Sequence, residues 1–152
     1  MKFNKEAIIN YLPHRDPFLF LDSVQVDYIA SKENIVGTKV SGSLFLNPEL
    51  ELFKGHFPSF PVFPGVLQIE ALSQLSCFTL APYKGSEKLL FFLLQTNNFK
   101  FKKMCRPNDT LILKSEIINK KAEMLIFKVS AFINDQEVCS GEIWGTAQKN
   151  EK

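Results

Sequence analysis

One stretch constrains the fold more than any other: GHFPSFPVFPGVLQIEALSQ, from Gly55 to Gln74. Its first half holds three prolines and two glycines and therefore predicts a tight loop. Its second half continues to Leu80 with apolar residues on almost every side, and the run stops before Pro82. Pro64 suits the first position of a helix. A helix with so little polar surface is buried, so we expect the rest of the chain to wrap around it.

Within this stretch His56 lies in the loop and Glu70 on the helix, which places a base and a carboxyl group in an apolar setting. Burial would raise the pKa of Glu70, whereas a protonated His56 nearby would lower it. The helix N-terminus at Gly65 adds backbone N–H donors that stabilise negative charge. Gln74 shares the helix face of Glu70. The residues alone leave two interpretations open, an acid/base site and a structural role for both side chains.

The remaining elements follow from residue periodicity and turn signals. Asn4 caps a predicted short helix over residues 4–12. Another short helical turn follows Asn47. Strands are predicted over residues 18–29, 35–41, 89–101, 110–119, 124–133 and 137–146, with a frayed tail at 148–152. The sum is an α+β domain spanning residues 1–152, in which five to six mostly antiparallel strands curve round one long helix.

Composition excludes several function classes. A formal net charge of +2 over 152 residues is too mild to indicate nucleic-acid binding. The three cysteines are far apart and form no C-x-x-C pair, so neither a zinc site nor a disulfide framework is expected: Cys77, Cys105 and Cys139. The sequence lacks an apolar run of 18 residues, and we expect a soluble cytoplasmic protein.

Two motifs carry a resemblance to a known family. The stretch GHFPSFPVFPGVLQIEALSQ resembles the active-site segment of the FabZ-type β-hydroxyacyl-acyl-carrier-protein dehydratases of type II fatty acid synthesis. LPHRDPFLFLD at residues 12–22 resembles their N-terminal signature, and NNFKFKKMCRPNDTL is similar to a later RF-x-x-x-V-x-PGD segment. The likeness covers roughly residues 10–146. It implies a hot-dog fold, active sites shared between two protomers, and no metal or organic cofactor.

The resemblance also implies roles for particular residues. His56 would take the α-proton of a (3R)-3-hydroxyacyl thioester, Glu70 would protonate the leaving hydroxyl, and Gln74 would orient Glu70. The substrate would be contacted by the residues around the helix start, namely Phe57, Phe63, Gly65 and Val66, with the Gly65 N–H holding the thioester carbonyl. Glutamate rather than aspartate at position 70 favours a dehydratase without the isomerase activity of the FabA type.

Partners also follow from the resemblance. The substrate is expected on an acyl carrier protein, which would dock on a basic run: Lys100, Lys102, Lys103 and Arg106. An equally good interpretation of that run is a solvated strand end. The protein is expected to be a homodimer, which the family commonly assembles into a trimer of dimers. Fatty acid biosynthesis is the expected pathway, or a related lipid or polyene pathway.

Several residues depart from the family pattern or stand outside it. Phe60, Phe63 and Ser73 replace smaller or more flexible residues and are expected to reshape the acyl tunnel. His14 is expected to be structural, because no acidic partner is suggested near it. Four phenylalanines of the strand at 89–101 are expected in the core or a dimer interface: Phe91, Phe92, Phe99 and Phe101. Two other functions remain alternatives, a hot-dog acyl thioesterase and a non-catalytic acyl-carrier-binding subunit of a hetero-oligomer.

Overall fold

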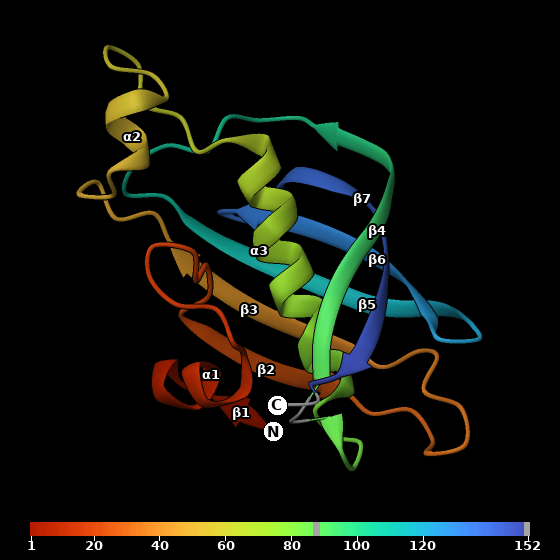
Figure 1. Ribbon diagram of the computed structural model, residues 1–152. Coiled ribbons are helices and arrows are strands. Elements are labelled where there is room, and N and C mark those ends of the chain that lie inside the picture. Colours follow the sequence, from red (N-terminus) through yellow and green to blue (C-terminus); the bar gives the residue numbers. More distant parts are fainter. Residues whose placement is uncertain (87–88, 151–152) are drawn as a thin grey trace.

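A seven-stranded antiparallel sheet curves round a central helix, as Figure 1 shows. The structure is a computed structural model that describes residues 1–86 and 89–150. Its strands are β1 (Lys2–Phe3), β2 (Ser23–Tyr28), β3 (Lys39–Phe45), β4 (Leu89–Phe101), β5 (Thr110–Lys121), β6 (Met124–Ile133) and β7 (Gln136–Lys149). Their order in the sheet is β1-β2-β3-β5-β6-β7-β4. The helices are α1 (Lys5–Tyr11), α2 (Leu52–Gly55), α3 (Gly65–Cys77) and the 3-10 turn η1 (Phe78–Leu80). The hot-dog architecture is confirmed.

The central helix α3 is buried as its composition predicts. Ala71, Leu72 and Leu75 are fully buried, and the helix packs chiefly against β5. Pro64 is the N-cap, with φ −58° and ψ 138°, and not the first helical residue as predicted. Its carbonyl oxygen accepts hydrogen bonds from the N–H groups of residues 67 and 68, so the helix begins at Gly65.

The alternation predicted for the fifth strand is confirmed. Leu111, Leu113, Ser115 and Ile117 all face inward and are buried. The buried Ser115 hydroxyl lies 2.7 Å from the hydroxyl of Ser76 on α3, so each satisfies the other inside the core. This pair joins helix and sheet by a polar contact amid otherwise apolar packing.

Some predicted boundaries are correct and others are wrong. The spans of β4 and β6 match the prediction, and Asn134 and Asp135 form the expected turn with positive φ. The strand predicted over 18–29 begins only at residue 23, because residues 18–22 cross the helix instead. The one predicted over 35–41 is shifted to 39–45, since Gly37 (φ +99°) turns the chain there.

The chain ends also differ from expectation. The two-residue strand β1 was not predicted, which raises the strand count above five to six. The expected frayed tail is wrong for Gln148 and Lys149, which pair with Leu90 and Leu89 of β4. The rest of that predicted tail includes residues 151–152, which lie outside the described residues.

Strand β4 lies at one edge of the sheet and pairs with β7, with two of its phenylalanine rings packed on β7 glycines. A Cβ built on Gly145 would lie 2.1 Å from the Phe91 ring, and one on Gly141 would lie 2.5 Å from the Phe99 ring. These two half-buried rings therefore rest directly on the backbone of β7. Along the same strand Phe92 and other apolar side chains are exposed, with 46–55% of their surface accessible: Phe92, Leu93, Leu94 and Phe101.

The close approach predicts the effect of a single methyl group. We expect Gly145→Ala to destabilise the protein by about 1–3 kcal/mol, because the Phe91 ring must move to admit the new Cβ. Urea unfolding measures the change. The matched control is Gly55→Ala, where a Cβ meets nothing within 4 Å, and there the free energy of unfolding should change by no more than about 0.5 kcal/mol. Equal free energies of unfolding for the two variants would contradict the packing of the Phe91 ring on Gly145.

Candidate active site

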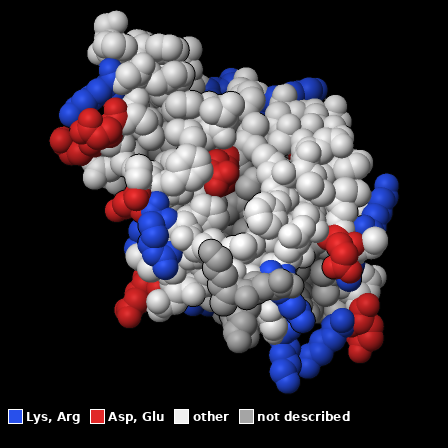
Figure 2. All heavy atoms as spheres, viewed as in Figure 1, with Lys and Arg blue, Asp and Glu red and all other residues white. Residues whose placement is uncertain are grey.

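Glu70 lies on α3 with its carboxyl group held by two side chains. The Gln74 Nε2 atom donates to Glu70 Oε1 at 2.9 Å, and the His14 Nε2 atom lies 3.4 Å from the same oxygen. About three-quarters of the Glu70 side chain is buried. In Figure 2 acidic atoms are visible near the middle of the face, surrounded by uncharged residues, over the position of α3 in Figure 1. The helix thus presents a recessed carboxyl group with defined partners.

Gln74 explains why the N-terminal loop lies where it does. Its Oε1 atom accepts a hydrogen bond from the Phe20 N–H at 2.9 Å, and its Nε2 atom donates to the Phe18 carbonyl at 2.9 Å. The side chain is almost fully buried. One amide therefore joins the loop to the helix and also fixes Glu70, as the prediction that it orients Glu70 requires.

His14 reaches Glu70 because that loop folds back across the helix. The expectation that His14 has no acidic partner is wrong, since the two residues are 56 positions apart and no local pattern links them. Its Nδ1 atom is buried and has no hydrogen-bond partner within the described residues. The neighbouring Arg15 guanidinium donates to the backbone carbonyls of Leu12 and His14 at 2.8 and 2.6 Å.

The electrostatics of Glu70 combine opposing effects. Burial raises the pKa of Glu70, but the hydrogen bonds from His14 and Gln74, together with the charge of His14, outweigh it. The net effect is a pKa below the ordinary range of a carboxyl group, so Glu70 is ionised at neutral pH in the single chain. Burial raises the pKa of the nearby Cys77 thiol to about 12, so that this thiol stays neutral.

His56 is held by its own loop. Its Nδ1 atom lies 2.8 Å from the Val62 carbonyl oxygen, which can only accept, so Nδ1 carries the hydrogen. The neutral ring then has an unprotonated Nε2 that can accept a proton. The ring stacks on that of Phe57, with centroids 4.1 Å apart. The histidine is thereby prepared as a base.

The two halves of the predicted site are not in contact within one chain. In residues 1–86 and 89–150 no hydrogen bond or ion pair joins His56 to Glu70. A cavity of about 40 Å³ adjoins Glu70, and His56 does not line it. Its lining consists of His14, Glu70, Ser73, Gln74, Cys77, Phe91 and Leu93. The acid and base halves are therefore separate features of the monomer.

Comparisons with known proteins show the family of this chain. Residues 31–142 match the family model described as ApeI dehydratase. The chain is 36% identical over 152 residues to a 3-hydroxyacyl-[acyl-carrier-protein] dehydratase FabZ of Pediococcus pentosaceus, covering 98% of this chain and 97% of the relative. It is 37% identical over 145 residues to a FabZ of Clostridium kluyveri, covering 94% of each. The chain belongs to the FabZ dehydratase family. The predicted family is thus confirmed.

Solved structures support the fold of this FabZ-family chain. The dehydratase heterocomplex ApeI:P of Xenorhabdus doucetiae matches with a TM-score of 0.68 at 16% identity, covering 95% of this chain and 91% of that one. A mutant of the fluoroacetyl-CoA-specific thioesterase FlK matches with a TM-score of 0.62 at 17% identity, covering 75% and 87%. At such low identity both likenesses show the fold alone.

The predicted substrate contacts of this family member differ in accessibility. Val66 and Phe57 are exposed, but Phe63 is almost fully buried, where it packs with Phe20 at a ring distance of 5.8 Å. The Phe101 ring covers Gly65, and a Cβ built there would lie 2.9 Å from it. Glycine is therefore needed at the helix start. A role for Phe63 beside an acyl chain stays a prediction.

The basic run is exposed, but most of its members have partners. Lys102 pairs with Glu137, and the Lys103 Nζ donates to the Gln136 side chain at 3.1 Å. The Arg106 guanidinium lies over the Phe60 ring, 4.7 Å from its centroid. Docking of a carrier protein on this run stays a prediction.

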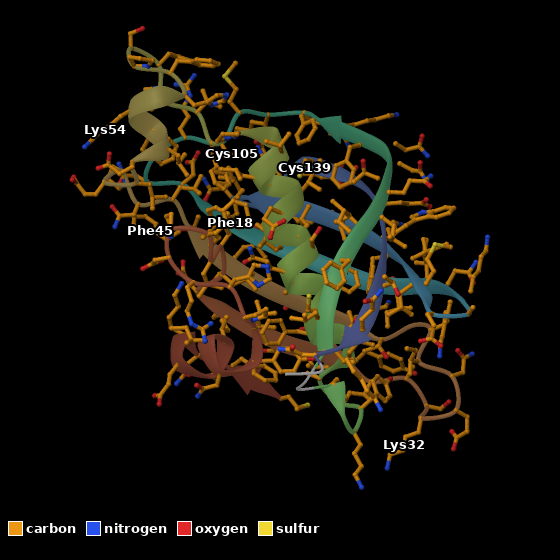
Figure 3. All side chains as sticks on the ribbon, viewed as in Figure 1. Phe18, Lys32, Phe45, Lys54, Cys105 and Cys139 are labelled. Carbon is orange, nitrogen blue, oxygen red and sulfur yellow. The ribbon has the colours of Figure 1, made fainter. Side chains whose placement is uncertain are left out.

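The cysteines lie in the interior and belong to neither half of the predicted site. The three cysteines are free and buried, and Figure 3 shows Cys105 and Cys139 in the interior near the start of α3. Burial raises the pKa of Cys105 to about 12 and that of Cys139 to about 11.

Neither a metal site nor a membrane-spanning helix is found in the described residues. No group of three or more potential ligands could hold a metal ion there, and no helix is long and apolar enough to span a bilayer.

Because the Gln74 side chain hydrogen-bonds the N-terminal loop to α3, its truncation should cost considerable stability. We expect Gln74→Ala to cost about 2–3 kcal/mol, because the buried Phe20 N–H and Phe18 carbonyl lose their partners. Chemical denaturation measures the loss. Gln95→Ala is the control, since within the part of the chain that the structure describes this exposed amide bonds only the nearby Asn97 side chain. A loss no larger than that of the control would show that the amide does not hold the loop.

Proposed function

We propose that this chain dehydrates (3R)-3-hydroxyacyl-[acyl-carrier-protein] to the trans-2-enoyl thioester, in fatty acid biosynthesis or a related lipid or polyene pathway. It would thus be a hydro-lyase of lipid metabolism. The observation that carries the proposal is the recessed carboxyl group of Glu70 held by Gln74 on a buried helix, in a chain whose FabZ relatives bear the dehydratase name.

His56 and Glu70 divide the proton transfers. The unprotonated Nε2 of His56 takes the α-proton, and the C–H electron pair forms the new double bond as the β-hydroxyl leaves. Glu70 gives that hydroxyl a proton, so that water departs. The N–H at Gly65, at the start of α3, stabilises the negative charge that develops on the thioester carbonyl oxygen. Val66, next to Gly65 in the helix, and Phe57, stacked on the His56 ring, are both exposed and would contact the substrate.

The separation of the two halves supports a shared site. Because His56 and Glu70 do not meet within one chain, we place Glu70 of one protomer opposite His56 of the partner subunit. The β4 edge, with its exposed apolar side chains, is a surface that a second copy would cover. We further propose that three such dimers assemble into a trimer of dimers.

The partner and the compartment are proposed on similar grounds. An acyl carrier protein with an acidic surface would dock on the exposed basic run, where Lys100 and Arg106 form no ion pair within the described residues. The buried free thiols suit a reducing cytoplasm.

Mass spectrometry of 3-hydroxyacyl carrier proteins of graded chain length tests the reaction through the loss of one water. We expect wild-type protein to convert them, and His56→Ala and Glu70→Gln each to lower kcat/KM at least about 100-fold because one proton transfer is lost. Circular dichroism verifies that both variants fold. Full activity in either variant would contradict the assigned roles. Release of free thiol without water loss would instead identify a thioesterase.

Subunit mixing tests the shared site. Each single variant destroys both sites of its own dimer, but a mixed dimer of His56→Ala and Glu70→Gln keeps one intact site. Random exchange should therefore restore about one quarter of wild-type activity. The control is mixing either variant with an excess of the double variant, which creates no intact site. Absence of recovery after verified exchange would place both residues in one protomer.

A further inference from the structure

His14 and Glu70 form a pair beside a small cavity, and each is about three-quarters buried. Both observed contacts to the carboxyl group, from His14 and from Gln74, are made to Oε1. Within the described residues no hydrogen bond involves Oε2, so this oxygen remains available to a substrate hydroxyl. The carboxyl group therefore has a protein side and a substrate side.

This arrangement raises a difficulty for Glu70 as an acid. The group must carry a proton when the hydroxyl leaves, yet its contacts lower its pKa and ionise it at neutral pH. An isolated carboxylate cannot protonate a leaving group. Histidine is the side chain whose ordinary pKa lies near neutrality, and one is in contact with this carboxylate.

We propose that His14 and Glu70 share one proton, which His14 holds between turnovers and delivers through Glu70 to the leaving hydroxyl. This inference rests on the proposed dehydration. His14 acts through Glu70 and does not touch the substrate, so it is a positioning residue that also supplies the proton.

The proton balance closes over one turnover. The imidazolium of His14 first passes the proton on Nε2 to the carboxylate of Glu70, which becomes a neutral carboxyl group. The C–O bond breaks with its electron pair on oxygen, and that oxygen takes the same proton from Glu70, which leaves a neutral His14 beside a carboxylate. Meanwhile the base His56 has gained the α-proton. After water and the enoyl thioester leave, His56 releases its proton to solvent and His14 takes one up.

No other residue that lines the cavity, among those the structure describes, is expected to exchange a proton with His14 or Glu70 near neutral pH. Among the described residues that line the cavity, Cys77 is the other titratable group, and burial raises its pKa to about 12. From β4 the cavity receives Phe91 and Leu93, which carry no charge. The Arg15 guanidinium is occupied by loop carbonyls.

The cavity beside His14 has a partly polar lining. Its volume of about 40 Å³ is enough for a water molecule. Two buried polar atoms of its lining residues, His14 Nδ1 and Ser73 Oγ, have no hydrogen-bond partner within the described residues. Ser73 stands where the family pattern has a small alanine, so the polar wall is a feature of this chain.

His14→Gln tests the proposal, because an amide can still donate to Glu70 but cannot store a proton. Two readouts should move in opposite directions. The optimum of kcat/KM should fall by about one pH unit and its peak about tenfold, since a carboxyl with an ordinary pKa of about 4 is then the sole acid. The pKa of Glu70, followed by carbon-13 NMR without substrate, should rise, because burial then lacks the opposing charge.

Arg15→Gln is the matched control, since the Arg15 guanidinium bonds the backbone carbonyls of Leu12 and His14 and, within the described residues, neither the His14 ring nor the Glu70 carboxyl group. Its pH optimum should equal that of the wild type. An unchanged optimum in His14→Gln, whatever its peak activity, would overturn the proposal and leave His14 a structural role. If that variant does not fold, a Glu70 carboxyl that titrates at or above the ordinary range in the wild type would overturn it too. Lack of dehydration by the wild type would overturn the proposed function, while the NMR titration would still report whether the pair exists.

Discussion

The side-chain amide of Gln74 is the contact on which the site depends. Buried in the helix face, it bonds the backbone at Phe18 and Phe20 and the carboxyl group of Glu70. Its burial makes these bonds compulsory, since each group left without a partner would cost free energy. The N-terminal loop consequently has one position on α3, and that position brings His14 to Glu70.

The environment of Glu70 then follows from competition between burial and hydrogen bonding. A carboxyl group buried alone would hold its proton, but His14 and Gln74 favour the ionised form. The proposed dehydration needs a proton donor at this point, and a paired imidazole would reconcile a lowered carboxyl pKa with acid catalysis. His56, held by Val62 on a separate loop, belongs to the other half of the chemistry.

The edge strand β4 connects the fold to assembly. Its inner phenylalanine rings pack directly on the glycines of β7, while Phe92 and its neighbours remain exposed. A long exposed apolar edge is a poor surface for a monomer. A second copy at this edge would cover it and would supply the base that one chain does not bring to its own acid.

The sequence alone determined the family, the buried helix α3, the alternation of β5 and the choice of His56 and Glu70, because periodicity and compact motifs are local properties. It did not determine that residues 18–22 cross the helix instead of joining the sheet, since their apolar composition suits either environment. Nor did it determine that His14 contacts Glu70. That contact exists only after the loop has folded back onto α3, and no spacing along the chain encodes a distance between residues brought together by packing.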